Sequence, residues 1–315
     1  KDASLPSANS ESGFGVEDGA LYFTYEKEGA TFYLDLPFRR QKSLDLGATT
    51  DKEVSNNGNI QFGNDKAQAY IKYSPFDKFT ATFGQFDTIY GVELNDSKDR
   101  VFGKTGIVYD TMLPVTHAGV QLQLDVGAGY IKALAANSAN KGTLGNSATG
   151  DNSYEYGGAI GYGSPAFRAQ VGYLQRPINK ADGSGNGNRG LIDVTLGTTL
   201  GIFTLDLEYL DLRDANKNQL TATNTDVEKN GMGLLLLTTV ALGDHWVAGL
   251  RVEQVKYDPG AIGYDGQSSA GFSLHYKVNA ALELRAEQIA YNNRLVGATE
   301  WLQDHRTIVS TLFVF

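Results

Sequence analysis

The chain has no cysteine among its 315 residues, which excludes disulfides, thiolate metal sites and cysteine nucleophiles. Proline is scarce, with 7 residues, and methionine is limited to 2. Glycine, by contrast, reaches 37 residues, tyrosine 17 and phenylalanine 15. Glycine and aromatic residues spread along a chain are typical of β-strands with tight turns and of aromatic belts.

Long apolar runs are also missing. The longest candidate, residues 231–243 around Leu234–Leu237, is interrupted by two threonines and falls short of the roughly 18 residues that a membrane-spanning helix needs. No basic-then-apolar signal peptide precedes the chain, so we expect Lys1 to be a processed or truncated terminus. A chain that crosses lipid without such a helix must be a closed barrel, because every backbone polar group in lipid needs an internal partner.

Positive charge is in deficit: the net charge is -9 and the sequence pI is near 5.0. This excludes a nucleic-acid partner, which requires a basic face. The chain has four histidines, His117, His245, His275 and His305. None has a serine and an acid at a recognisable spacing, so we interpret them as isolated surface or interfacial side chains. We therefore expect no enzyme. No spacing matches a calcium loop, so no metal and no cofactor are expected.

Strand patterns with a period of two recur along the chain. Between 203 and 209, for example, apolar residues alternate with Thr204, Asp206 and Glu208. About fifteen such strands are legible, the first at 19–26. Because single-chain bacterial barrels have an even strand number, we predict about sixteen strands. The sixteenth would lie in residues 1–18, where only Phe14 and Val16 hint at alternation; the alternative is fourteen strands, with one of the fifteen being a loop.

The connections between these strands alternate in length. Short turns such as 26–29, 74–78 and 242–245 separate long polar stretches at 39–59, 91–116, 137–152, 177–188, 213–230, 258–267 and 292–305. Such asymmetry predicts an all-β fold, a transmembrane antiparallel β-barrel with short periplasmic turns and long outer loops. Residues 1–315 would form one barrel domain, placed in a lipid bilayer.

Ionised residues follow one face of the predicted strands. They are expected to point inward, because a lysine or arginine facing lipid at mid-depth costs about 2–4 kcal/mol. An ionised interior should be wet, and in a barrel of this size water means a channel. The alternative is mutual neutralisation between neighbouring strands. The candidate pore-wall residues are Lys66, Lys72, Lys132, Arg168, Asp206, Glu208, Arg251, Glu253, Glu283 and Arg285.

Two segments resemble a known family. The run Gly84-Gln-Phe-Asp-Thr-Ile-Tyr-Gly91-Val-Glu93 is similar to a G-x-F-x-T-x-x-G-x-E pattern of OmpL-like outer-membrane β-barrel porins, as is Pro114-Val-Thr-His-Ala-Gly119. The C-terminal aromatics Phe313 and Phe315 resemble the signal that the outer-membrane assembly machinery recognises. The resemblance implies a pore in the bacterial outer membrane, and, as in general porins of this size, a homotrimer.

The connection 91–116 follows the fifth strand if one strand precedes residue 19. In sixteen-stranded general porins the loop at that place folds into the lumen and narrows the pore. By that resemblance, charged residues of the connection would set a transverse field at the constriction. The alternative is a solvated outer loop. The candidate constriction residues are Glu93, Asp96, Asp99, Arg100, Lys104 and Asp110, together with Lys98.

These patterns predict passive diffusion of ions and small polar solutes, with a mild cation preference drawn from the net acidity. One alternative is a channel specific for sugars or another nutrient class, in which the inward Tyr22, Tyr33 and Tyr70 would begin an aromatic line. In a purely structural interpretation, these tyrosines pack against an infolded loop. The other alternative is a sealed structural or adhesive barrel. A seam of small residues around Gly157, Gly158 and Gly161 is a candidate subunit interface, although glycine in a strand also marks close backbone approach.

Overall fold

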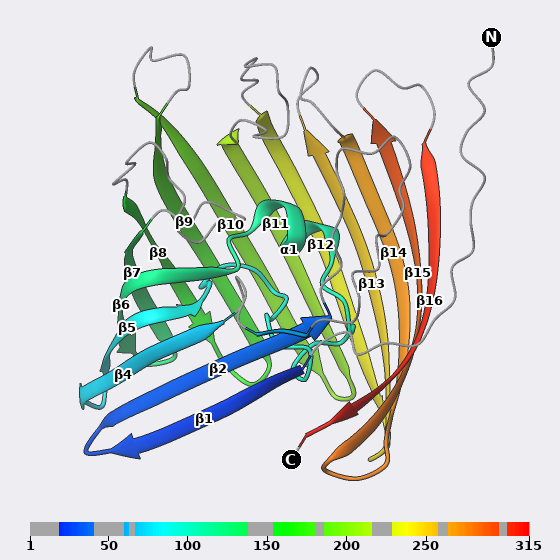
Figure 1. The fold of residues 1–315 in the computed structure, drawn as a ribbon, viewed down its shortest axis with the longest axis horizontal. Helices are drawn as coiled ribbons and strands as arrows, with labels where there is room; N and C mark the ends of the chain where they lie inside the picture. The colour runs from blue at the N-terminus through cyan, green and yellow to red at the C-terminus, as the bar shows by residue number, and fades with distance from the viewer. Residues whose placement is uncertain are drawn as a thin grey trace.

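The computed structural model of the chain describes residues 19–40, 60–62, 67–137, 154–179, 186–215, 229–257, 264–295 and 301–314. Within these ranges one antiparallel sheet contains sixteen strands, fifteen of them side by side (Figure 1). The strands are β1 (Gly19–Lys27), β2 (Ala30–Arg40), β3 (Ile60–Phe62), β4 (Gln68–Phe76), β5 (Phe79–Asp87), β6 (Thr116–Val126), β7 (Gly129–Asn137), β8 (Tyr154–Gly163), β9 (Phe167–Asn179), β10 (Asn186–Leu200), β11 (Phe203–Ala215), β12 (Lys229–Leu242), β13 (Trp246–Tyr257), β14 (Tyr264–Lys277), β15 (Leu282–Leu295) and β16 (Leu302–Phe313). One short helix, α1 (Ile107–Met112), interrupts them.

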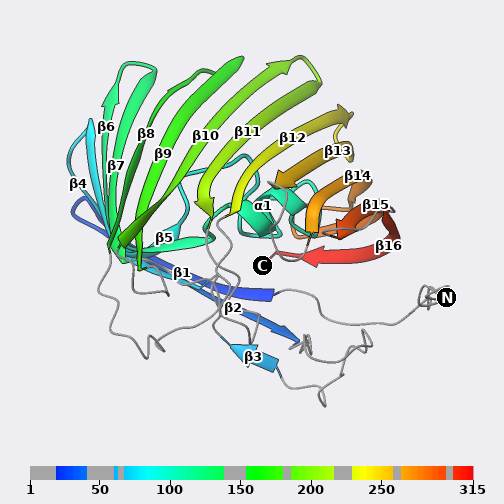
Figure 2. The same cartoon turned by 90° about the horizontal axis from the view of Figure 1, so that it is seen from above.

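Each strand pairs with its neighbours in sequence, from β1 to β16. The exception is β3, which pairs with the same strand, β2, as β4 does: Phe62 lies opposite Phe38, and Gln68 lies opposite Asp35. Fifteen strands therefore lie side by side, and β3 continues the line of β4. The predicted strand in residues 1–18 lies outside the described residues. Figure 2 shows the sheet curving into a barrel wall around the segment that carries α1.

Short turns join the strands at one end of the barrel, and long connections leave from the other. The turn between β10 and β11 has only two residues, and Gly201 adopts a φ of 61°, which favours glycine. Several strands extend into stretches predicted as loops. β10 begins at Asn186, within the predicted loop 177–188, and β16 begins at Leu302, so His305 pairs with Ala290 instead of lying in a loop.

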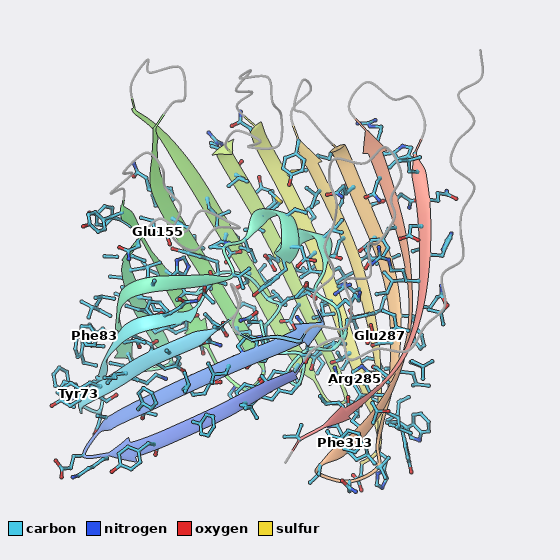
Figure 3. The ribbon with its side chains drawn as sticks, in the orientation of Figure 1. Tyr73, Phe83, Glu155, Arg285, Glu287 and Phe313 are labelled. Carbon is cyan, nitrogen blue, oxygen red and sulfur yellow. The ribbon has the colours of Figure 1, made fainter. Side chains whose placement is uncertain are left out.

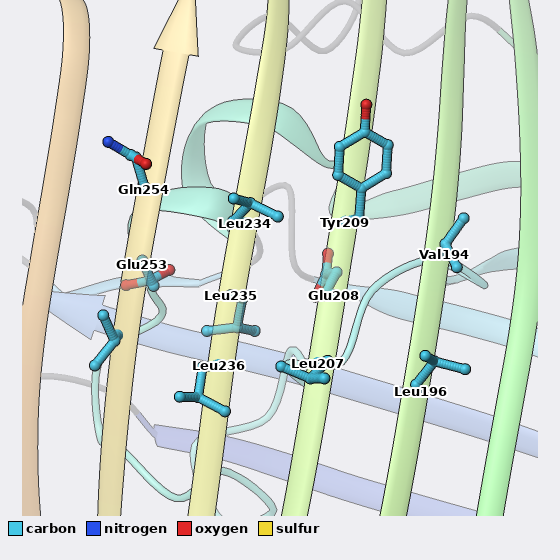
Figure 4. A pocket seen from close by; sticks show the side chains of 11 residues that line it. Val194, Leu196, Leu207, Glu208, Tyr209, Leu234, Leu235, Leu236, Glu253 and Gln254 are labelled. Atoms are coloured by element: carbon cyan, nitrogen blue, oxygen red, sulfur yellow. The ribbon is translucent and has the colours of Figure 1, made fainter.

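The two faces of the wall differ in chemistry. Outward side chains such as Tyr73, Phe83 and Phe313 are exposed, whereas Glu155 and Glu287 on the inward face are buried (Figure 3). The same alternation is visible across β10–β13, where an apolar pocket is lined by Glu208, Leu235, Glu253 and Gln254 and mainly by outward apolar residues (Figure 4): Val194, Leu196, Leu207, Tyr209, Leu234, Leu236 and Val252. Aromatic residues cluster at the strand ends: Tyr25, Phe76, Tyr162, Phe167, Phe203 and Trp246 near the short turns, and Tyr154 and Tyr156 at the other end.

An outward apolar band between aromatic girdles is the surface that lipid requires of a transmembrane β-barrel. The inward face is therefore the face that can meet water. Among the residues that the structure describes, no helix is long and apolar enough to cross a membrane.

Candidate functional site

Residues 88–115, which connect β5 to β6, lie against the inward face of the wall; we call them the inner loop. They carry α1, which contacts β12, β13 and β14. Both views of the fold place α1 inside the curve of the sheet (Figures 1 and 2). The described part of the long connection thus occupies the barrel interior.

Carboxylates of the wall accept hydrogen bonds from the backbone of the inner loop. The amide of Gly91 donates to Asp193 at 2.9 Å, and that of Val92 donates to Glu208 at 2.8 Å. Farther along, the Gly103 amide donates to Glu287 at 2.7 Å and the Val108 amide to Glu253 at 3.0 Å. All four acids are at most 3% exposed. Hydrogen bonds from four strands therefore hold the inner loop along its length.

An arginine from β13 forms the centre of this attachment. Arg251 is fully buried, and its Nη1 donates to Glu93 Oε1 at 2.7 Å and to the carbonyl oxygen of Lys104 at 2.9 Å. Its Nε lies 3.2 Å from Glu253 Oε2, and its guanidinium lies 4.4 Å from the ring centroid of Phe102. Burial raises the pKa of the Glu93 carboxyl, and the positive charge of Arg251 opposes that rise. Arg251 therefore places one positive charge between two buried carboxyl groups, one from the inner loop and one from the wall.

Apolar contacts complete the attachment. Phe102, Val108 and Leu113 of the inner loop are at most 1% exposed. They belong to one cluster with inward residues of the wall, including Leu174, Leu191, Leu210, Leu212, Leu235, Leu237, Val255 and Ile289. Fully burying one such side chain contributes about 1.5–3 kcal/mol. Apolar side chains therefore alternate with the buried acids on this part of the inward face, whereas the pattern predicted an ionised face.

Inward glycines provide the space in which aromatic residues of the inner loop pack. Tyr90 is 1% exposed, and its hydroxyl donates to the carbonyl oxygen of Tyr173 at 2.8 Å. A Cβ atom added to Gly172 would lie 2.7 Å from the Tyr90 ring, and one added to Gly157 would lie 2.3 Å from the Tyr90 hydroxyl. Only glycine permits this approach at both positions.

The proposed outer seam of small residues is therefore wrong for two of its three members. Gly157 faces Tyr90 inside the barrel, and a Cβ atom on Gly161 would meet the ring of Tyr130 at 2.2 Å. Both glycines mark close approach on the inward face.

The predicted constriction residues fall into two groups. Glu93 and Arg100 are each 7% exposed and support the inner loop from within; Arg100 donates to the carbonyl oxygens of Asn95 and Gly103. Asp99 and Asp110 are exposed, while Asp96 and Lys104 are half-buried. Only the second group has side chains that water can reach.

The predicted wall residues divide in the same way. Glu208, Arg251 and Glu253 lie beneath the inner loop, and Arg285 donates to the carbonyl oxygen of Ser97 at 2.8 Å. Away from these contacts lie Lys72, Lys132, Glu283 and the Arg168–Asp206 ion pair. Phe313 is on the outward face of β16, at 64% exposure. Lys66 and Phe315 lie outside the described residues.

Two histidines differ from their interpretation as isolated surface side chains. His117 is fully buried; its Nδ1 lies 2.5 Å from Glu155 Oε1 and its Nε2 lies 3.1 Å from Thr88 Oγ1, where the inner loop leaves β5. His275 is 4% exposed, and its Nε2 bonds the carbonyl oxygen of Val101 at 2.6 Å. Both histidines hold the inner loop. Within the described ranges, no group of three or more His, Asp or Glu side chains is arranged to hold a metal ion.

The curved antiparallel wall, its apolar outer band and the loop packed inside define the architecture of an outer-membrane porin. The model of the family described as putative beta-barrel porin-2, OmpL-like, matches residues 3–310. The chain belongs to this family, which places it in the bacterial outer membrane as a porin-like channel protein. The resemblance seen in the sequence is thereby confirmed.

Solved structures share the fold at low sequence identity. The outer membrane channel DcaP of Acinetobacter baumannii superposes with a TM-score of 0.68 at 13% identity, over 96% of this chain and 85% of that one. OmpF of Salmonella typhi, in a complex with daunomycin, gives 0.60 at 14% identity, over 97% and 93%. The trimer form of OmpT of Vibrio cholerae gives 0.59 at 12% identity, over 95% and 92%. No curated protein sequence matches the chain.

Proposed function

We propose that the protein forms a water-filled channel for passive diffusion of ions and small polar solutes, and that the inner loop narrows it. One observation carries this proposal: wall carboxylates and Arg251 bind the loop backbone at Gly91, Val92, Gly103, Lys104 and Val108. A loop bound at so many points is a fixed part of the interior. The open path for solutes then lies between the loop and the strands that the loop does not cover.

Polar inward side chains on those strands support a wet path. Gln121 and Gln123 on β6 and Lys132 on β7 are half-buried, and Lys72 on β4 is exposed. The inner loop presents the exposed carboxylates of Asp99 and Asp110. We propose that these acids meet the solute, while Glu93 and Arg100 hold the loop in shape. Facing charges of this kind determine ion selectivity in pores.

Planar-bilayer recording of the purified protein tests the channel directly. We expect ohmic current steps, and in a salt gradient a reversal potential that shows mild cation preference, because the net charge is -9. Steps in groups of three equal levels would support the homotrimer that we propose from the likeness to OmpT. Folded protein that inserts without conducting would contradict the channel and favour a sealed barrel. Anion selectivity would contradict the assigned charges.

We further propose that the C-terminal aromatics, Phe313 included, serve recognition by the outer-membrane assembly machinery. The exposure of Phe313 on the last strand of the sheet supports this role. We propose no catalytic activity and no cofactor.

A further inference from the structure

A basic cluster lies on the outward face of the wall, at the long-connection ends of β13, β14 and β15. In the register Lys256 lies opposite Gly266, and Gly266 lies opposite Arg294. Val255 is fully buried on the inward face, so its neighbour Lys256 points outward. Trp301 precedes β16, and the Arg294 guanidinium lies 5.2 Å from the centroid of a Trp301 ring. We call Lys256, Gly266, Arg294 and Trp301 the rim site.

Gly266 gives the rim site a floor without a side chain. A Cβ atom added there would lie 3.2 Å from Cη2 of Trp301 and 3.9 Å from Nη2 of Arg294. A guanidinium beside an aromatic ring keeps N–H donors at its edge. Arg294 has a further partner within the chain, and its five donors serve several acceptors at once. Lys256 is exposed, and no acid of the described residues pairs with its ammonium group, so it adds a second positive charge.

Hydrogen-bonding side chains form the next outward row, two residues closer to the middle of the wall. Ser268 lies opposite Gln254 on one side and Asn292 on the other. Asn292 in turn lies opposite Gln303. Lipid requires apolar side chains at outward positions, so this amide row departs from the rest of the outer band. At the same end of β8 the outward side chains are aromatic, Tyr156 among them.

The amide row borders the apolar pocket of β10–β13. Gln254 lines this pocket together with Val252, Leu234 and Leu236 (Figure 4). Cations at the rim, amides in the next row and an apolar pocket beside them follow the order of groups in a phosphorylated lipid: phosphate, polar linkage and acyl chain. Basic side chains next to an apolar surface are the usual way in which membrane proteins recognise anionic headgroups.

We propose that the rim site binds a phosphate group of the glycolipid in the outer leaflet of the outer membrane. The amide row meets the sugar and amide groups of this lipid, and the pocket of β10–β13 holds an acyl chain. The long connections lie on the outer side of the membrane, which places the rim site at the headgroups. Because the net charge of the chain is -9, phosphate binding requires local cations. The inference does not depend on conduction, since a sealed barrel would present the same outward site.

Tryptophan fluorescence reports on this site. The chain has two tryptophans, Trp301 and, at the short-turn end of β13, Trp246. In Trp246→Phe the remaining Trp301 reports on the rim site alone. The probe is lipid A, the phosphorylated anchor of lipopolysaccharide, added to refolded protein in detergent. It should shift the Trp301 emission and saturate. Dephosphorylated lipid A should have a dissociation constant at least about tenfold higher, because hydrogen bonds to a charged group are lost.

Four variants in the Trp246→Phe background locate the binding. Lys256→Ala and Arg294→Ala should each raise the dissociation constant for lipid A by about tenfold, the effect of losing one hydrogen bond to a charged group. Gly266→Leu keeps both charges but covers the floor, so it should weaken binding as well. Arg213→Ala is the matched control. Arg213 is exposed at the long-connection end of β11 and pairs with Asp211, and its replacement should leave the dissociation constant unchanged.

The comparison of the two lipids needs only Trp246→Phe, so the test stays decisive if another variant misfolds. An equal response to lipid A with and without phosphate would overturn the inference, as would no response to either. Equal weakening in Arg213→Ala and Lys256→Ala would also overturn it, since general surface charge would then explain the binding. Displacement of lipid A by an equal concentration of inorganic phosphate would assign the rim site to free phosphate instead. Native mass spectrometry gives the last outcome: an oligomer that separates in Lys256→Ala and retains no lipid A would make this face a subunit contact.

Discussion

Replacement of Arg251 by methionine should lower the free energy of unfolding by about 3–5 kcal/mol, the cost of leaving buried charges unpaired. Arg251 is fully buried between Glu93 and Glu253, and methionine keeps much of its volume without its charge. The inner loop should then separate from the wall near Lys104, and the single-channel current should become larger and noisier. Urea titration of the refolded protein, followed by tryptophan fluorescence, measures the loss of stability.

Two controls separate buried charge from general damage. Arg168→Met removes an ion pair whose arginine side chain is 46% exposed, so it should cost at most about 1 kcal/mol. Adding Glu93→Gln and Glu253→Gln to Arg251→Met should restore most of the stability, since neither of the two acids that faced Arg251 then carries a charge. Equal costs for Arg168→Met and Arg251→Met would contradict the buried position of Arg251.

The loss in Arg251→Met should also shrink at acidic pH. Burial already raises the pKa of Glu93, and removal of Arg251 takes away the main charge that lowers it. A carboxyl whose pKa is higher in the folded than in the unfolded protein stabilises the fold below its unfolded pKa, and this contribution disappears as the pH rises through the folded pKa. Acidification therefore restores stability to the variant. A deficit that grows on acidification would contradict this assignment.

The second large effect is expected at Gly172. In Gly172→Val the new side chain would enter the space of the Tyr90 ring, since even a Cβ atom would lie 2.7 Å from it. We expect a cost of about 1–3 kcal/mol, typical of overpacking, and an altered channel current because Tyr90 begins the inner loop. Tyr90→Ala should remove the clash, so Gly172→Val should cost much less in the Tyr90→Ala background than alone.

Gly163→Val is the control for the Gly172 experiment. Gly163 lies on β8, and nothing is within 4 Å of an added Cβ atom there. Its replacement should leave stability and current almost unchanged. If Gly172→Val lowers the free energy of unfolding equally with Tyr90 present or absent, the packing of Tyr90 against Gly172 is contradicted.

The sequence predicted the fold well wherever strands cross lipid. Between Phe203 and Tyr209 the apolar residues must alternate, because only one face of β11 meets lipid. The pattern failed at the long-loop ends. Residues 186–190 of β10 contain no apolar side chain, so alternation ends before the strand does. Backbone pairing continues there without a hydrophobic face to reveal it.

The sequence contains a sign of the apolar inward side chains that a search for alternation alone does not detect. In Leu234–Leu237 the outward and the inward positions are both apolar. Leu234 is 42% exposed on the outward face, and Leu235 is 3% exposed under the inner loop. A strand apolar on both faces is covered on both. The run therefore signals that something packs inside the barrel at β12, although it does not say which segment.

The sequence could not predict which charged residues of the wall the inner loop covers. Asp206 and Glu208 occupy equivalent alternating positions on β11, yet only Glu208 bonds the loop, to Val92, 116 residues away along the chain. Glu253 bonds Val108 across 145 residues. Contacts at such separations depend on how the barrel curves, and local patterns carry no information about that.

The central claim, that the inner loop lies in the conduction path, is tested most directly with a single cysteine. The chain has none of its own, so Asp110→Cys introduces a unique thiol at an exposed position of the loop. Asp244→Cys, in the short turn after β12, is the control. A bulky anionic methanethiosulfonate reagent should reduce the single-channel current of Asp110→Cys in one step per subunit and leave that of Asp244→Cys unchanged. Complete labelling of Asp110→Cys, verified by mass, with an unchanged current would contradict the account.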